Sequence, residues 1–321
     1  MAKAVFISAT NCITPIGFDV ADNIAAIESG LGGINRFENS WMENPYYSAI
    51  IDEQKLNDAF SNISEVDNYT KLEKMMILAL APVISQSKSK INDNTLLILS
   101  TTKGNIGALE NNQIAHAQLS QLAKTIAQFF GFKTEPVVVS NACVSGILAV
   151  AIAKRMIQAN QCDDAFVVSG DLVSEFVLSG FNSFQAMSAA PCKPYSANRT
   201  GVTLGEAAAA VHVTCDVTNA RAKILGDGAI NDANHISGPS RTGEGLFRSI
   251  ESAIKEAGIS PSQIDYISAH GTATPFNDEM EAIAFNRLGL ENVPVNSLKG
   301  YYGHTLGASG LLETVIGIES M

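Results

Sequence analysis

A single thiol, Cys143, lies in the segment VVVSNACVSGILAVAIAKRMI (residues 137–157), between an apolar β-branched run and a long helical pattern. A strand that turns directly into a helix places Cys143 at or near the helix N-terminus, where unpaired backbone N–H groups and the helix dipole favour a thiolate. The small residues Ala142, Ser145 and Gly146 let a substrate approach closely. This is the geometry of a nucleophile turn in acyl-transfer enzymes. The alternative is an inert cysteine, because free cysteine is commonly buried.

Two histidines follow apolar strands at the start of loops. His270, in SAHGTATPFNDEMEA, stands where α/β folds carry functional groups. In NSLKGYYGHTLGASGLLE, the ammonium of Lys299 helps to keep His304 neutral, and a neutral imidazole can donate an N–H to a developing oxyanion. Glu313 is either exposed on a helix or within reach of Lys299. The alternatives are a structural histidine and a glycine-rich turn with a surface lysine.

The absence of several known motifs argues against other kinds of site. The five cysteines form no Cys-x-x-Cys pair, and no histidine-rich stretch has zinc spacing. We expect His116 on a helix surface, His212 in the core and His235 in a loop where it can line a pocket. No G-x-G-x-x-G follows a strand, and there is no Walker loop or H-E-x-x-H. The sequence therefore predicts no nucleotide or redox cofactor, no metal and no zinc protease.

Alternating strand and helix patterns position these residues. The strands are expected at 4–9, 95–100, 136–140, 164–170, 206–214, 221–230, 264–270 and 293–297, and the helices at 19–30, 69–87, 115–130, after Cys143, at 243–258, 278–289 and after His304. Because the strands are continuous apolar runs, we expect an α/β fold with a mostly parallel sheet covered by helices on both faces. A polar seam near 215–222 divides an N-terminal half (1–215), carrying the nucleophile, from a C-terminal half (216–321), carrying the histidines. The second half is shorter by about two strands, so we expect a C-terminal segment to be missing.

Composition narrows the class of protein. The chain has 321 residues, of which 46% are hydrophobic and 17% charged, enough for a sizeable core. A net charge of -11 makes it a poor general binder of nucleic acid or anionic membrane. The N-terminus, MAKAVFISATN, is no secretory signal, and the apolar runs are too short to cross a bilayer. A reducing cytoplasm with free thiols is the simplest interpretation.

Taken together, SNACVSG, AHGTATPFND and NSLKGYYGHTLGASG resemble the motifs of the β-ketoacyl-acyl-carrier-protein synthases, condensing enzymes of the thiolase fold. PCKPYSANRTGVTLGEAAAAV resembles the family's intervening segment, so the resemblance covers nearly the whole chain in order. The Cys-His-His set is similar to that of the elongating synthases rather than the Cys-His-Asn set of the initiating type. The resemblance implies two similar α/β halves in five layers, αβαβα. It also implies a dimer that pairs through the strand before Cys143, either a homodimer or a heterodimer with a related synthase subunit.

The resemblance also implies a mechanism in fatty acid, polyene or related lipid biosynthesis. Cys143 takes an acyl group from an acyl carrier protein, and malonyl carrier protein then loses carbon dioxide. His270 and His304 stabilise the enolate, which attacks the acyl-cysteine to give a β-ketoacyl product. Lys299 sets the charge and position of the histidines, and Glu313 holds Lys299 or its waters. No cofactor is implied.

Lys71 and Lys74, at the start of the 69–87 helix, stand where the resemblance would place a docking patch for the acidic carrier protein. The alternative is a solvated helix face.

The chain departs from the family pattern at several positions. It has Ser196 and Thr200 where the family usually has acidic residues, and Ala207 where the family has glycine. These differences indicate a divergent member, serving a specialised polyene or secondary-lipid pathway. The family's glycine-rich C-terminal loop, which would give a second oxyanion donor, is also missing. Since losing one such donor costs about 10²–10³ in rate, we expect the chain as given to be weak or inactive.

Three other functions compete with the condensing enzyme. A non-catalytic partner subunit that determines chain length would typically lack the cysteine, and Cys143 with both histidines argues against it. A degradative thiolase using coenzyme A would need a second catalytic cysteine, and none follows Cys215. A Cys-His protease lacks a matching context around Cys143.

Overall fold

The computed structural model describes residues 3–232 and 240–321, and within them eleven strands and eleven α-helices. The strands are β1 (Val5–Ile13), β2 (Asn35–Phe37), β3 (Tyr46–Ala49), β4 (Thr95–Ser100), β5 (Val137–Val139), β6 (Asp164–Asp171), β7 (Leu204–Gly205), β8 (Ala207–Thr214), β9 (Ala222–Ile224), β10 (Ile267–Ser268) and β11 (Val295–Asn296). The helices are α1 (Val20–Glu28), α2 (Glu53–Phe60), α3 (Lys71–Ser87), α4 (Ile114–Ala117), α5 (Leu119–Phe130), α6 (Ser145–Gln158), α7 (Glu175–Ser183), α8 (Glu244–Ala257), α9 (Pro275–Arg287), α10 (Lys299–Tyr302) and α11 (Ser309–Glu319). No helix within these residues has the length and apolar character that a bilayer crossing demands.

Six strands form the central sheet, in the order β5-β4-β6-β8-β1-β9. β4 is parallel to both β5 and β6, whereas the β6–β8, β8–β1 and β1–β9 pairings are antiparallel. The prediction of a mostly parallel sheet is therefore wrong. All eight residues of β8 are buried, and a strand covered on both faces is a continuous apolar run whatever its direction.

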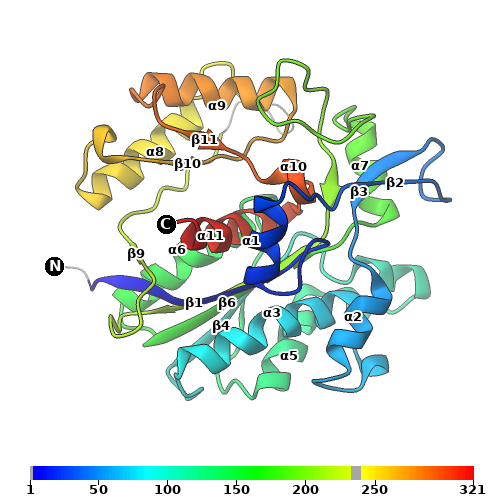
Figure 1. Ribbon diagram of the computed structural model, residues 1–321. Helices are drawn as coiled ribbons and strands as arrows, with labels where there is room; N and C mark the ends of the chain where they lie inside the picture. Colours follow the sequence, from blue (N-terminus) through cyan, green and yellow to red (C-terminus); the bar gives the residue numbers. More distant parts are fainter. Residues whose placement is uncertain (1–2, 233–239) are drawn as a thin grey trace.

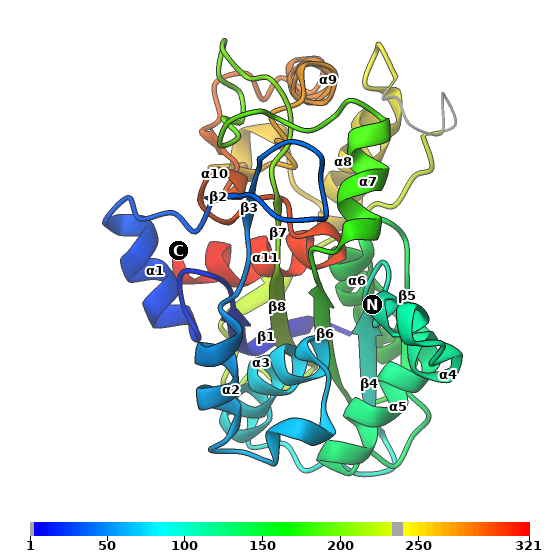
Figure 2. The same cartoon turned by 90° about the vertical axis from the view of Figure 1, so that its right-hand side faces the viewer.

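The elements stack in five layers (Figures 1 and 2). Helices α2, α3 and α5 cover one face of the central sheet, and α6 and α11 cover the other. Beyond α6 and α11 lies the two-stranded parallel sheet β10–β11, with α8 and α9 outermost. This is the predicted order αβαβα. A small sheet, β2-β3-β7, stands at the side of the molecule.

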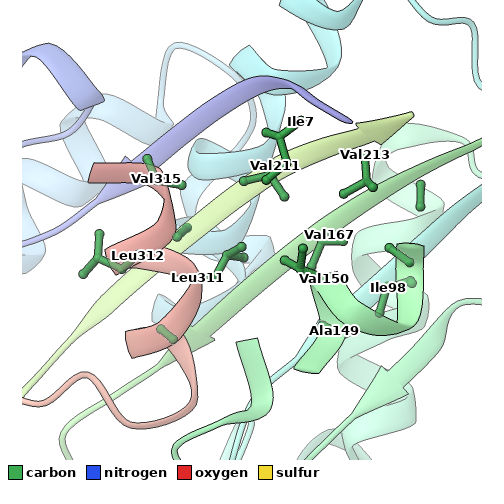
Figure 3. Packing of buried hydrophobic residues seen from close by; sticks show 14 of the residues in the cluster. Ile7, Ile98, Ala149, Val150, Val167, Val211, Val213, Leu311, Leu312 and Val315 are labelled. Atoms are coloured by element: carbon green, nitrogen blue, oxygen red, sulfur yellow. The ribbon is translucent and has the colours of Figure 1, made fainter. Parts of the chain in front are cut away.

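The central strands bury both of their faces by alternation. In β8, Val211 and Val213 belong to the core beneath α6 and α11, whereas Ala208 and Ala210 belong to the core beneath α3 and α5. Figure 3 shows the first of these cores, where side chains of both helices meet the sheet. The labelled residues are Ile7, Ile98, Ala149, Val150, Val167, Val211, Val213, Leu311, Leu312 and Val315. This packing fixes α6 and α11 against each other beside the site.

Several predicted elements differ from the structure. The strands expected at 264–270 and 293–297 are only Ile267–Ser268 and Val295–Asn296. The strand expected at 221–230 is only Ala222–Ile224, and it pairs with β1 at the edge of the central sheet. The helix expected at 115–130 is two helices, because the chain is extended at Gln118, which caps α5. His116 is exposed on α4, and His212 is buried in β8 against Phe166, as expected. His235 lies outside the described residues.

Candidate active site

The nucleophile turn connects β5 to α6. Cys143 stands two residues before Ser145, the first residue of α6. Ala142 has a left-handed backbone, with φ of 46°, which is uncommon for a residue with a Cβ and marks a sharp turn. The Ser145 hydroxyl accepts from the N–H of Asn141 at 2.8 Å and donates to the carbonyl of Ala142 at 2.6 Å. The turn is therefore held by a side chain of the helix that it opens.

Gly146 brings this turn against the second histidine loop. A Cβ at Gly146 would lie 2.8 Å from the carbonyl oxygen of Gly307 and 2.9 Å from the Cβ of Leu311. A side chain at this position would therefore push α6 away from the loop that follows His304. The absence of one lets the thiol and the imidazole meet.

The fold brings Cys143, His270 and His304 together from three separate loops. The Nε2 atom of His304 lies 3.0 Å from the Sγ atom of Cys143, across 161 positions of sequence. The rings of His270 and His304 have centroids 5.1 Å apart and stand nearly perpendicular. One nitrogen of each ring and the sulfur all lie within 4.8 Å of one another.

Lys299 joins the first histidine loop to α11. Its Nζ atom lies 2.5 Å from the Oε1 atom of Glu313 and donates to the carbonyl of His270 at 2.6 Å. The lysine is fully buried. Burial raises the pKa of the Glu313 carboxyl, and the Lys299 ammonium opposes that shift. Of the two placements considered for Glu313, the structure has the one within reach of Lys299.

Both imidazoles are neutral at physiological pH. Burial and then the Lys299 ammonium lower the pKa of His270 to about 3. The same two causes, with a contribution from His270, lower the pKa of His304 well below its usual range. Lys299 thus acts on the charge of the rings in the direction that the sequence predicts.

The thiol differs from the prediction. Cys143 is partly exposed, but neighbouring atoms surround its sulfur. Burial therefore raises the pKa of the thiol to about 11, and this effect outweighs the opposing effect of the Lys299 ammonium. The helix start favours a thiolate locally, but desolvation disfavours the charged form more strongly. The resting group is therefore a thiol in contact with His304 and not the predicted thiolate.

A cavity of about 710 Å³ leads to Cys143 and His270. Much of its wall is apolar, including Val144, Ile147 and Tyr266. The thiol is therefore open to a substrate of considerable size.

Two groups that hold the histidines were not predicted from the sequence. The Ser309 hydroxyl lies 2.9 Å from the Nδ1 atom of His304. The Glu281 carboxylate accepts from the backbone N–H groups of His270 at 2.8 Å and Gly271 at 2.7 Å. Both lie near the histidine motifs in sequence, and helical spacing from the motif ends is the signal that could have found them.

Lys71 and Lys74, the residues predicted to dock the carrier protein, both pair with neighbouring side chains. The Nζ atom of Lys71 lies 2.6 Å from Glu206, which is 1% exposed, while Lys71 itself is partly exposed. Lys74 is 6% exposed and donates to Asn57 at 2.8 Å, so it offers little surface to a partner. Docking of the carrier protein at Lys71 stays a prediction.

This chain combines a five-layer α/β fold with a thiol and two uncharged imidazoles that meet from three loops, and these are the features of a ketosynthase. The chain belongs to the β-ketoacyl synthase family: the model for the beta-ketoacyl synthase N-terminal domain matches residues 2–215, and that for the C-terminal domain matches residues 221–321. It thus has the thiolase-like fold of that family, as predicted.

Individual relatives agree with this assignment. The chain is 28% identical, over an alignment 357 positions long, to 3-oxoacyl-[acyl-carrier-protein] synthase 2 of Staphylococcus aureus strain N315, covering 99% of this chain and 86% of the relative. A chain in the complex of a ketosynthase with its chain length factor from Xenorhabdus doucetiae superposes with a TM-score of 0.85 at 26% identity, covering 97% of this chain and 82% of that one. A beta-ketoacyl synthase from Burkholderia phymatum shares the fold, with a TM-score of 0.85 at 22% identity over 99% of this chain and 86% of that one.

Proposed function

We propose that this chain condenses an acyl group carried on Cys143 with malonyl-acyl-carrier-protein, releasing carbon dioxide and giving β-ketoacyl-acyl-carrier-protein. The observation that carries the proposal is the 3.0 Å contact between Cys143 Sγ and His304 Nε2, with the neutral His270 ring beside it. The name of the Staphylococcus aureus relative, a 3-oxoacyl-acyl-carrier-protein synthase, supports the same reaction.

The first half of the reaction loads the thiol. The Cys143 sulfur attacks the carbonyl carbon of an acyl-carrier thioester, and the carrier sulfur leaves. The proton of the Cys143 thiol ends on the carrier sulfur, so the balance needs no other reactant. His304 is the group in position to carry that proton, because its Nε2 atom lies 3.0 Å from Sγ.

The second half forms the carbon–carbon bond. Malonyl carrier protein loses carbon dioxide, and the remaining electron pair becomes an enolate with negative charge on the thioester oxygen. Uncharged His270 and His304 donate N–H groups to that oxygen. The enolate carbon then attacks the acyl carbon and expels the Cys143 thiolate, which takes a proton from solvent to return to the resting thiol. Lys299 and Glu313 act through the histidines, by holding the His270 loop and keeping both rings uncharged.

The partner that delivers both substrates is an acyl carrier protein, and the working assembly is a dimer, with itself or with a related synthase subunit. The Xenorhabdus doucetiae complex of a ketosynthase with its chain length factor supports the second arrangement. The division into halves at 1–215 and 216–321 and a cytoplasmic location belong to the same proposal. The five cysteines are free, in keeping with a reducing compartment.

The same likeness leaves a second candidate, a non-catalytic subunit that determines chain length. Structural likeness to a ketosynthase paired with its chain length factor is the observation behind it. The presence of the thiol and both histidines at contact distance favours the catalytic function.

Incubation of the chain with acyl carrier proteins that carry acyl groups of several lengths, followed by peptide mass spectrometry, distinguishes the two candidate functions. We expect an acyl group on Cys143, none in Cys143→Ala, and unchanged labelling in Cys215→Ser, which removes an exposed cysteine outside the site. Acyl label on another cysteine would contradict the catalytic assignment. No label, together with a change in the product length of a separate synthase mixed with the chain, would support the non-catalytic subunit.

A further inference from the structure

Cys143, His270 and His304 are residue types that commonly bind metal ions. Their sulfur and nitrogen atoms lie within 4.8 Å of one another, on three loops far apart in sequence. Tetrahedral Zn²⁺ with sulfur at about 2.3 Å and nitrogen at about 2.0–2.1 Å separates its ligand atoms by about 3.3–3.6 Å. The 3.0 Å contact between Cys143 and His304 must therefore widen slightly, and a separation of up to 4.8 Å must close by about 1.2–1.5 Å through side-chain torsions.

The chemistry of the three side chains suits a metal ion. An imidazole in its uncharged form binds a metal through its unprotonated ring nitrogen without loss of a proton, and a cysteine binds through its sulfur. Binding replaces only the thiol proton: the S–H bond of Cys143 breaks, a sulfur–metal bond forms, and the proton leaves to solvent. The Lys299 ammonium disfavours positive charge on both rings, and its pairing with the Glu313 carboxylate at 2.5 Å offsets part of that repulsion.

The surroundings supply the remaining needs of such a site. The Ser309 hydroxyl can accept from Nδ1–H of His304, which leaves Nε2 free to bind the metal. The cavity of about 710 Å³ at Cys143 and His270 gives an entry path and room for a water as the fourth ligand.

We propose that Cys143, His270 and His304 bind a borderline or soft divalent cation such as Zn²⁺, which reversibly occupies the nucleophile. Binding itself is independent of the condensation reaction. Inhibition by the metal rests on the proposed function, because it requires Cys143 to be the acyl carrier.

Cobalt substitution tests the site directly. Chelator-treated protein titrated with Co²⁺ should develop a sulfur-to-cobalt charge-transfer band and the visible bands of tetrahedral cobalt, and Zn²⁺ should remove both. Cys143→Ala should abolish the charge-transfer band, and His270→Ala or His304→Ala should raise the Co²⁺ dissociation constant at least about tenfold. Ser309→Ala should raise it by about 10–100-fold if the hydroxyl orients His304.

A matched control removes one cysteine and one histidine outside the site. The double variant Cys215→Ser/His116→Ala should keep the full band, since both residues are exposed and far from the triad in sequence. Absence of the band in wild-type protein with a native circular dichroism spectrum, or its persistence in Cys143→Ala, would overturn the metal site. Prior acylation of Cys143 by an acyl-carrier-protein thioester should prevent the charge-transfer band. A band that forms after this treatment would contradict acylation of Cys143 but would not contradict the metal site.

Discussion

Replacing Lys299 with methionine tests whether one buried ion pair holds the site together. The change leaves the Glu313 carboxylate without the ammonium 2.5 Å away and the His270 carbonyl without its donor at 2.6 Å. Water cannot fully replace the lost partner, because Lys299 is fully buried and Glu313 is only 8% exposed. Breaking a buried pair by removing one member typically costs about 3–5 kcal/mol of unfolding free energy. That loss is a large part of the 5–15 kcal/mol, roughly, by which a protein is stable.

The double variant Lys299→Met/Glu313→Leu separates charge from shape. An apolar pair of similar volume is commonly neutral or better than the ion pair, so we expect most of the lost stability to return. Decarboxylation of malonyl carrier protein should not return, because the His270 carbonyl still lacks its donor. Urea unfolding followed by circular dichroism measures the first quantity and carbon dioxide release the second. If Lys299→Met lowers the free energy of unfolding by less than about 1 kcal/mol, or if the double variant is as unstable as the single one, the reasoning is refuted.

Three further predictions concern the thiol, a histidine and a glycine. Because the pKa of His270 falls from 6.5 to about 3 on folding, the unfolded chain binds more protons below pH 6.5, and His270 should contribute a fall in stability on acidification of about 1.4 kcal/mol per pH unit through that window. His304, whose pKa is also lowered, acts in the same direction, so His270→Phe should reduce the pH dependence of the urea midpoint without abolishing it. Because the Cys143 pKa is about 11, its alkylation by iodoacetamide should quicken about tenfold per pH unit from pH 7 to 10, and a plateau near pH 8 would show a thiolate. Gly146→Ala should slow acylation of Cys143 by roughly 10²-fold by moving α6, whereas Gly180→Ala, which meets nothing within 4 Å, should leave the acylation rate unchanged.

Strands and helix ends were predicted well where neighbouring residues alone determine them. The strand expected at 95–100 is β4, Thr95–Ser100, and the helix expected to end at residue 130 ends there, followed by the cap Gly131 with φ of 74°. Strand direction was not predictable from burial, since β8 is buried throughout and antiparallel to both neighbours. The short strands β2, β3 and β7 were missed, because none of them lies in a continuous apolar run long enough to show a strand pattern.

In the candidate site, too, some features were predictable from neighbouring residues and others depend on the whole fold. Each of Cys143, His270 and His304 could be placed at the end of an element from its own neighbourhood, but their mutual distances are a property of the fold. Lys71 illustrates the limit: its partner, Glu206, is 135 positions away, so a lysine at a helix start resembles a surface charge until the fold is known. Spacing along the chain likewise gave no metal site, although three ligand atoms converge in space.

Burial acts on the site in two opposing ways. It keeps His304 uncharged, as an N–H donor to the enolate requires, but it also keeps the Cys143 thiol protonated. One imidazole nitrogen, Nε2, must therefore take part in removing the thiol proton and later donate to the enolate. These tasks require opposite tautomers, and a hydroxyl on Nδ1 allows both because it can accept or donate. Ser309 is placed to do this, so its hydroxyl, absent from the cysteine and histidine signals in the sequence, is a positioning group of the proposed reaction.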